Sequence, residues 1–269
     1  MTKAYVLPHP PLAVPAVGRG EEAKIKDTLS AFRKAAQEIA EFAPQTLIVV
    51  TPHSTVYSDY FHISPGEKAR GDLSRFGVST VVVEASYDTA LAQEIKICVE
   101  SLGIPAGGKG ERDPSLDHGT LVPLWFINQE FTGYNLVRIS PTGMRPVDHY
   151  IFGQAISSAV EKTGRRVVLI ASGDLSHKLT KEGPYGFAPE GPQFDQAIVS
   201  ALSTGDLPAL AKIPADLREG AAECGYNSLM VMAGYFDGKD VETRLLSYEG
   251  PFGVGYAVAS VCSLPFKLY

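Results

Sequence analysis

The sequence predicts an α/β fold, with a single domain built on a central mixed, largely parallel sheet and helices on both faces. Continuous apolar runs such as 47–50 and 167–170 are typical of parallel strands that are buried on both sides. Amphipathic helical patterns lie between such runs, so strands and helices alternate along the chain. With 269 residues and 45% hydrophobic content, the chain can bury one large core.

The first half of the chain shows this alternation clearly. Apolar residues recur at steps of three and four from Ile25 to Ile39, which predicts an amphipathic helix that Pro44 ends. The elements expected here are, in order, a strand at 4–7, this helix, a strand at 47–50, a strand at 60–63, a strand at 80–83 and a helix at 89–102.

The second half continues the same pattern and closes with two strands. The elements expected here are an apolar segment at 121–126, a helix at 147–162, a strand at 167–170, a helix through 229–233 and strands at 241–248 and 254–261. Because both ends of the chain supply strands, we expect one domain over residues 1–269. Loops at 64–77, 107–114 and 180–192 are long enough to form the rim of a site.

Composition excludes several classes of partner. The net charge of -6 is spread through interspersed acidic and basic residues, without the basic face that nucleic acid requires. No apolar stretch approaches the roughly 18 residues of a membrane span, and the start of the chain does not resemble a signal peptide. We therefore expect a cytoplasmic protein with neither nucleic acid nor membrane as a partner. A homo-oligomer is left open, because apolar interface cannot be told from core.

Three cysteines are too few and too widely spaced for a disulfide framework or a zinc knuckle. Cys98 and Cys262 have apolar neighbours and are expected to pack in the core. Cys224 lies instead beside a glutamate at the entrance of the expected helix, where a thiolate could bind a soft metal.

Histidines follow the expected strands at their carboxyl ends. His9, His53 and His177 each come just after a strand, at the edge where open α/β sheets build their sites. His118 lies in a turn before 121–126. Any one of the four could be a turn or cap residue, but four at like positions favour a shared site.

The remaining two histidines have no such placement. His62 falls within an expected strand and His149 within an expected helix, so we expect both to be packing or surface residues.

Four gathered imidazoles favour a metal site. A non-haem iron oxygenase needs two imidazoles and one carboxylate, which leaves positions open for substrate and O2. The other two histidines can then act as acid and base. For the carboxylate, Glu219 and Glu223 flank the helix entrance, and we expect Glu223 to be the ligand, with Cys224 as its competitor.

Acidic neighbours can orient these imidazoles. Asp117 precedes His118 and Asp174 lies three residues before His177, so both are expected to hold a histidine ring in one tautomer.

Two other patterns indicate different chemistry less well. Gly107-Gly108-Lys109-Gly110 could cradle a phosphate, but it does not follow a convincing Rossmann strand. Segment 172–177 also contains the residue types of a hydrolytic triad in Ser172, Ser176, Asp174 and His177, yet there is no Gly-x-Ser-x-Gly elbow.

Together the motifs resemble the LigB-like superfamily, which includes class III extradiol ring-cleavage dioxygenases, Memo-like proteins and LigB-like proteins of the AmmeMemoRadiSam system. The resemblance runs from Leu7 to about Ala259. It rests on Pro8-His9-Pro10-Pro11, Thr51-Pro52-His53, Asp117-His118-Gly119-Thr120, Ser172-Gly173-Asp174-Leu175-Ser176-His177 and Glu223-Cys224-Gly225-Tyr226.

The resemblance implies roles for these residues. It implies that His9, His53 and Glu223 bind Fe(II), that His118 and His177 handle protons, and that the substrates are O2 and a small aromatic such as a catechol. Zinc is the alternative metal. The cysteine beside Glu223 is closer to the Memo-like and AmmeMemoRadiSam groups, which implies a second candidate, a metal-binding accessory protein without ring cleavage.

Overall fold

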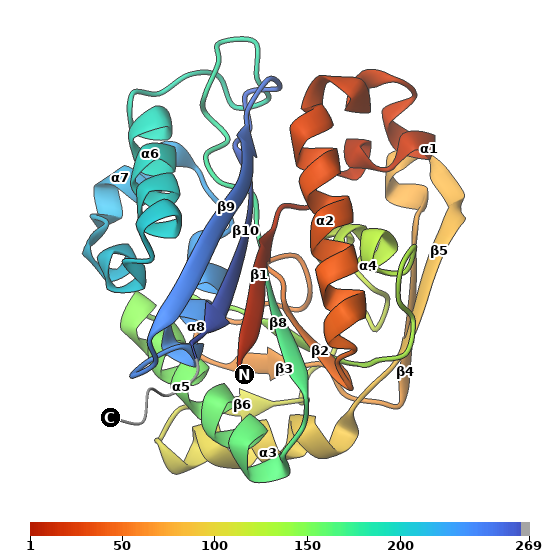
Figure 1. Ribbon diagram of the computed structural model, residues 1–269, viewed down its shortest axis with the longest axis vertical. Coiled ribbons are helices and arrows are strands. Elements are labelled where there is room, and N and C mark those ends of the chain that lie inside the picture. Colours follow the sequence, from red (N-terminus) through yellow and green to blue (C-terminus); the bar gives the residue numbers. More distant parts are fainter. Residues whose placement is uncertain (265–269) are drawn as a thin grey trace.

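The computed structural model describes residues 1–264, and its centre is a mixed eight-stranded sheet in the order β6-β3-β7-β2-β8-β1-β10-β9 (Figure 1). The strands of this sheet are β1 Lys3–Leu7, β2 Thr46–Val50, β3 Phe61–Ile63, β6 Ala106–Gly107, β7 Asn135–Ser140, β8 Val167–Ser172, β9 Val241–Glu249 and β10 Tyr256–Ser263. Strands β4 Lys68–Leu73 and β5 Val78–Ser86 form a separate hairpin.

Parallel pairing dominates the middle of the sheet. Strands β7, β2, β8 and β1 pair in parallel, while β3–β7, β1–β10 and β10–β9 are antiparallel. This confirms the predicted mixed, largely parallel sheet in an α/β domain to which both ends of the chain contribute. The predicted extent 1–269 stays a prediction, and residues 265–269 lie outside the described part of the chain.

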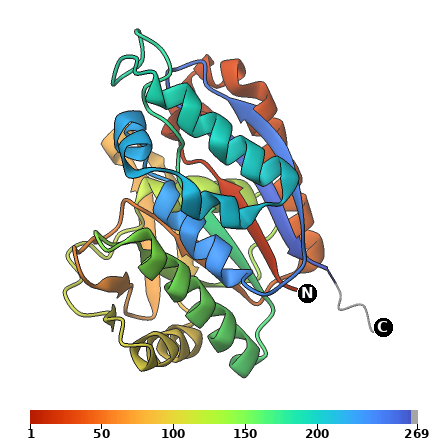
Figure 2. The ribbon, with the colours of Figure 1, turned by 90° about the vertical axis from the view of Figure 1, so that its left-hand side faces the viewer.

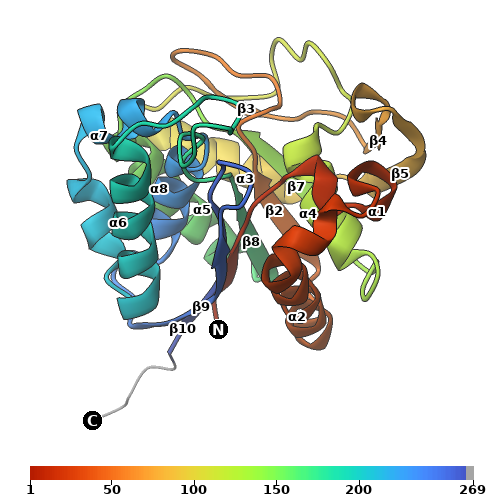
Figure 3. The same cartoon turned by 90° about the horizontal axis from the view of Figure 1, so that it is seen from above.

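Helices cover both faces of the sheet, as Figures 2 and 3 show. The helices are α1 Pro15–Gly18, α2 Lys26–Phe42, α3 Thr89–Ser101, α4 His118–Ile127, α5 Pro146–Thr163, α6 Glu190–Thr204, α7 Ala215–Ala221 and α8 Tyr226–Tyr235, with short 3₁₀ turns at Pro11–Ala13, Glu21–Ile25, Ser74–Phe76 and Leu207–Lys212. One face packs against α3, α5, α6 and α8, and the other against α2, α4 and the β4–β5 hairpin.

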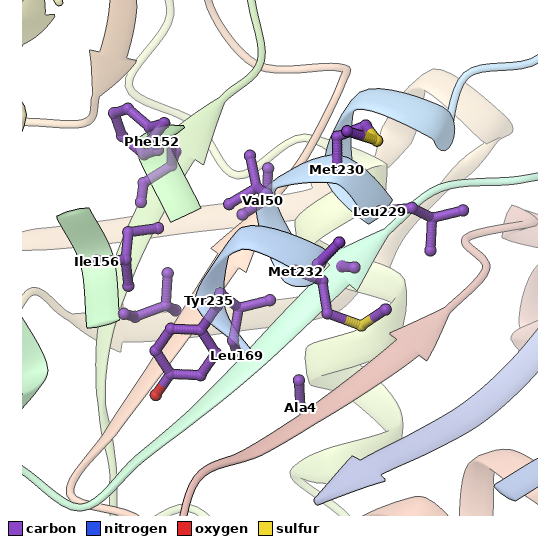
Figure 4. Close-up of a cluster of buried hydrophobic side chains, with 14 of the residues drawn as sticks. Ala4, Val50, Phe152, Ile156, Leu169, Leu229, Met230, Met232 and Tyr235 are labelled. Atoms are coloured by element: carbon purple, nitrogen blue, oxygen red, sulfur yellow. The ribbon is translucent and has the colours of Figure 1, made fainter. Parts of the chain in front are cut away.

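The first of these cores is continuous from sheet to helix. Figure 4 shows Val50 of β2 and Leu169 of β8 among side chains of α5 and α8, including Phe152 and Met232. All residues of β2 and β8 are buried, which explains their unbroken apolar sequence. These buried central strands form a rigid base for the loops at their carboxyl ends.

The structure differs from the sequence-based expectations at several elements. Residues 80–83 lie in β5 of the separate hairpin, and the expected loop 64–77 contains β4. The apolar segment 121–126 is helical, since it belongs to α4 and is buried on nearly every side. Strand β7 and helix α6 were not expected, because a charged Arg138 interrupts the first and Gly191-Pro192 opens the second.

Within residues 1–264, we find no helix with both the length and the apolar character that crossing a membrane requires.

Candidate metal centre

Three neighbouring parallel strands bring the predicted histidines to one edge of the sheet. His9 follows the end of β1 and His53 follows the end of β2, while β8 lies between these strands and leads through Ser172 toward His177. Since carboxyl ends of parallel strands meet at the same edge, residues far apart in sequence converge there.

His9, His53 and Cys224 form a compact group of potential metal ligands. The Nε2 atoms of the two histidines are 3.0 Å apart, and the Sγ of Cys224 is 3.6 Å from Nε2 of His9. Their ligand atoms all lie within 4.8 Å of one another. Tetrahedral zinc has zinc–nitrogen bonds of about 2.0–2.1 Å and zinc–sulfur bonds of about 2.3 Å. This geometry implies about 3.3 Å between two nitrogen ligands and about 3.6 Å between a nitrogen and a sulfur ligand. The donor set therefore fits a single transition-metal ion.

Ser172 fixes the tautomer of His9. The Ser172 hydroxyl donates its one hydrogen to the carbonyl oxygen of Gly119 at 2.5 Å, so it can only accept from Nδ1 of His9 at 2.9 Å. Nδ1 therefore carries the proton, and the lone pair of Nε2 points toward the shared position. A hydrogen bond behind a metal-binding imidazole sets its orientation in this way.

Cys224, rather than the predicted Glu223, completes this group. The Glu223 carboxylate accepts a hydrogen bond from the backbone N–H of Tyr226 at 2.6 Å, at the start of α8. It thus binds the first residue of α8, and Glu223 is not part of the three-residue group. The other acidic candidate, Glu219, is exposed.

Two glycines explain how the Cys224 segment reaches His9. A Cβ added to Gly173 would lie 2.1 Å from Cα of Gly225, so only glycine lets the loop after β8 contact the segment before α8. The backbone N–H of Asp174 then lies 3.3 Å from Sγ of Cys224, and Asp174 accepts from the backbone N–H of His9 at 2.8 Å. These contacts join both segments to the loop after β1.

His118 stacks on His53 beside the group. Their ring centroids are 4.2 Å apart with an interplanar angle of 26°, and His118 is 5.2 Å from His9 by the same measure. Asp117 caps α4 by accepting from the N–H of Thr120, and it accepts from the Thr51 hydroxyl at 2.6 Å. One carboxylate therefore ties the loop of His53 to the helix that begins at His118.

His177 presents a defined tautomer as well. Its Nδ1 lies 2.6 Å from the carbonyl oxygen of Ala222, which can only accept, so Nδ1 carries the proton. Tyr185, in the loop that follows, packs against this ring edge-on at 5.3 Å. His177 can therefore receive a proton at Nε2.

Burial shapes the charges of the site. Burial first, and then the neighbouring His53 and His118, lower the pKa of His9. Burial lowers the pKa of His118 to about 4, and it also lowers the pKa of His53 and of His177. The four imidazoles are thus neutral near pH 7, which is the form that binds a metal.

Acidic groups near the site are shifted in the opposite direction. Burial raises the pKa of Glu223 to about 7 and that of Asp174 to about 7. Burial, with Asp174 nearby, also raises the pKa of the Cys224 thiol. A cation bound beside the sulfur would favour the thiolate, because it supplies the missing positive charge.

A cavity of about 560 Å³ opens beside His53 and His118. Its lining residues are mostly polar: His53, Ser54, Thr55, Val56, Arg70, Gly71, Asp72, Ser74, Arg75, Phe76, Arg112, Asp113, Ser115, Leu116, Asp117 and His118. Phe76 packs edge-on against His118 at 5.2 Å between ring centroids. The size is in the range of small-molecule sites.

The structure thus brings together four predicted histidines but reassigns the residues around them. Asp174 bonds the backbone of His9 rather than a ring, and Asp117 bonds threonines; within residues 1–264 neither carboxylate hydrogen-bonds an imidazole. Sequence reasoning missed Ser172 as the partner of the His9 ring, although it lies within the recognised motif. It also missed Phe76, because no local pattern relates the 64–77 loop to His118.

The residues expected to be structural are largely buried. His62 and His149 are buried completely, and Cys98 is buried in the core, while Cys262 in β10 is only half-buried.

Comparisons with known proteins show which family the chain matches. Residues 3–259 match the family described as the catalytic LigB subunit of aromatic ring-opening dioxygenase. Protein CA_C1420 of Clostridium acetobutylicum is 39% identical over 261 residues, which are 94% of this chain and 56% of that protein, so the chain spans about half the length of that relative.

One further relative and one solved structure match nearly the whole chain. The 2-aminophenol 1,6-dioxygenase beta subunit of a Pseudomonas species is 25% identical over 94% of this chain and 91% of its own. The solved structure of protein JW3007 from Escherichia coli K12 shares the fold with a TM-score of 0.62 at 16% identity, covering 97% of this chain and 99% of that one. Because the family match extends over almost all of the described sequence, this chain belongs to the LigB family of aromatic ring-opening dioxygenase catalytic subunits.

Proposed function

We propose that the chain is a non-haem, metal-dependent dioxygenase of extradiol type, which opens a catechol or a related ortho-substituted aromatic with O2. The observation that carries this proposal is the His9, His53 and Cys224 group beside a cavity with His118 on its wall. A relative named for 2-aminophenol, an ortho-substituted aromatic, supports the substrate class.

The metal in this proposal is Fe(II), with zinc as the alternative, held by His9, His53 and Cys224. Iron with open positions would bind the aromatic and O2 side by side and let electrons pass between them. In this proposal Cys224, and not Glu223, is the third ligand, because its sulfur lies with the two imidazoles. Ser172 keeps the Nε2 of His9 free of a proton.

His177 and His118 perform the proton chemistry in this proposal. His177 donates from Nδ1 to the carbonyl of Ala222, which leaves Nε2 to take a proton from a substrate hydroxyl. His118 lines the cavity and is neutral near pH 7, so it can hydrogen-bond the substrate without adding charge. Phe76 packs edge-on against this ring and adds an apolar surface beside it.

Anaerobic reconstitution with Fe(II) tests the proposal. Oxygen uptake and a yellow ring-opened product are expected with at least one member of a panel of catechols and 2-aminophenols. A His118→Gln protein with the same iron content is the control for turnover at the metal alone. Iron binding without turnover over the whole panel would contradict ring cleavage.

A second candidate rests on the sulfur itself. Iron oxygenases commonly use two imidazoles and a carboxylate, whereas a thiolate also suits zinc and Cu(I). Cys224 in the ligand group therefore favours a metal-binding accessory protein of the Memo-like kind, without ring cleavage. Tight metal binding by the three residues, combined with the absence of oxygen uptake, distinguishes it from the dioxygenase.

The setting of either function is also proposed. We infer a single LigB-like domain over 1–269 that works in the cytoplasm, with a homo-oligomer left open. The partners are a small aromatic molecule and O2, and neither nucleic acid nor a membrane.

A further inference from the structure

Arg138 carries a positive charge into the centre of the fold. It lies in β7, next to β2 in the sheet, and its side chain has no exposed surface. Burying an ion is costly unless charges and hydrogen bonds compensate for the lost water. The groups around this guanidinium therefore have to be held firmly in place.

Its partners belong mostly to the segment that leads to His118. Nη1 donates to the carbonyl oxygen of Ser115 at 2.5 Å, and Nη2 lies 3.4 Å from the Glu111 carboxylate. Nη1 is also 3.7 Å from Oδ2 of Asp117. The remaining donor, Nε, reaches the hydroxyl of Ser64 at 2.7 Å. One planar group thus holds three points of segment 111–117.

Asp117 connects the segment held by Arg138 to the site. Its Oδ1 accepts from the Thr51 hydroxyl and from the N–H of Thr120, so it connects the loop of His53 with the first turn of α4. His118 is the first residue of that helix, and its ring stacks on His53. Moving Asp117 would therefore change the placement of His118 and of the cavity wall.

Glu111 has one other basic group within 4.0 Å in the described part of the chain. This group is His62, whose Nε2 lies 4.0 Å from the carboxylate. Within residues 1–264 neither ring nitrogen of His62 has a hydrogen-bond partner. None of the hydrogen bonds of Arg138 in the same part of the chain reaches His9, His53 or Cys224.

We propose that Arg138 is a positioning residue, whose guanidinium fixes segment 111–117 and thereby sets His118 against His53 at the wall of the cavity. It acts mainly on the geometry of the proton-handling side of the site, and none of its own hydrogen bonds reaches a proposed metal ligand. The kinetic part of this inference rests on the proposed function, while its structural part does not.

A graded series of variants tests the proposal: Ser64→Ala, Arg138→Lys and the double variant Arg138→Met with Glu111→Gln, which avoids leaving the Glu111 carboxylate without its guanidinium partner. The imidazole signals of His118 are recorded by NMR in zinc-loaded protein, alongside metal content and, with Fe(II), kcat and KM. We expect metal content to stay near normal in every variant. The shift of the His118 signals should grow from Ser64→Ala through Arg138→Lys to the double variant. In the double variant kcat should fall roughly 10- to 100-fold.

Arg165→Met is the matched control. Arg165 pairs with buried Asp88 at 3.2 Å and precedes β8, at the opposite end of the strands from the site. This variant loses stability, but its His118 signals and kcat are expected to stay as in the wild type.

Three results would overturn the proposal. The first is unchanged His118 signals in Ser64→Ala and Arg138→Lys. The second is that the His118 signals of the Arg138 variants shift no more than those of Arg165→Met. The third is that the Arg138 variants lose metal together with the shift of the His118 signals. If the wild type turns over no aromatic, the proposed function fails, but the NMR series still decides the role of Arg138.

Discussion

The proposed function divides the side chains at this site into those that hold a metal and those that move protons. His9 has its Nε2 freed by Ser172 and directed at His53 and Cys224, whereas His177 has its Nδ1 bound to a carbonyl and lies outside the three-residue group. Replacing a ligand and replacing a base should therefore have different signatures.

We expect His9→Ala and His53→Ala to lose metal and activity together, since two remaining ligands bind a divalent ion poorly. His118→Gln and His177→Gln should keep near-normal metal and lose roughly 10²- to 10⁴-fold in rate. Metal analysis of the purified variants is the measurement. Retained metal in the His9 variant with loss in the His177 variant would show that the roles are exchanged.

The adjacent pair Glu223 and Cys224 provides a second test at this scale. Cys224→Ser should lower metal affinity by more than the roughly 10- to 100-fold that is typical when a residue behind a ligand is changed. Glu223→Gln should bind metal normally, because its oxygen can still accept from the N–H of Tyr226. Competition with a chromogenic chelator gives both affinities, and equal losses would argue against the sulfur ligand.

At the scale of elements, the site depends on two segments that meet at Gly173. Gly173→Ala places a Cβ 2.1 Å from Cα of Gly225 and must push the Cys224 segment away from the loop after β1. We expect a loss of about 1–3 kcal/mol in the free energy of unfolding, together with weaker metal binding.

Gly133→Ala is the control for this substitution, because its new Cβ would meet only the side chain of Phe131 at 3.1 Å. Urea unfolding and metal titration of both variants are the measurements. Normal metal affinity in Gly173→Ala would contradict the role given to this contact.

The junction between β7 and α5 makes a prediction for pH. His149 accepts from the N–H of Thr142 at 3.0 Å and donates to the carbonyl of Arg145, and burial lowers its pKa to about 4. Between pH 4 and about 6.5 the unfolded chain binds a proton that the folded chain excludes, so this residue's contribution to stability falls as pH drops through that window.

His149→Gln can keep both hydrogen bonds and has nothing to titrate. From about pH 6.5 down to about pH 4, the free energy of unfolding should decrease in both proteins. The decrease should be smaller in His149→Gln than in the wild type, by roughly 1–3 kcal/mol. Unfolding curves at a series of pH values measure this difference. Parallel curves for the two proteins would rule out His149 as a source of the pH dependence.

For the whole molecule, the sequence predicted what depends on local pattern. Buried parallel strands such as Leu47–Val50 are apolar throughout, so their place in the sheet and the histidine after them could be predicted. The pairing of β5 with β4 instead of the central sheet depends on contacts between distant residues. The same holds for Phe76 beside His118 and for Arg138 beneath segment 111–117.

The proposed third ligand shows this limit most clearly. Glu223 and Cys224 are adjacent, and both residue types bind metals, so the local sequence could not distinguish them. The distinction comes from the close approach of Gly173 to Gly225 and from the start of α8, which takes up the Glu223 carboxylate.

The central claim is that His9, His53 and Cys224 hold one metal ion. X-ray absorption spectroscopy on protein purified without chelator, at the edge of the bound metal, tests it most directly. We predict one sulfur at about 2.3 Å and two imidazole nitrogens at about 2.0–2.1 Å if the metal is zinc, with the sulfur signal absent in Cys224→Ser. A first shell of nitrogen and oxygen alone in the wild type, lost in Glu223→Gln, would contradict the account.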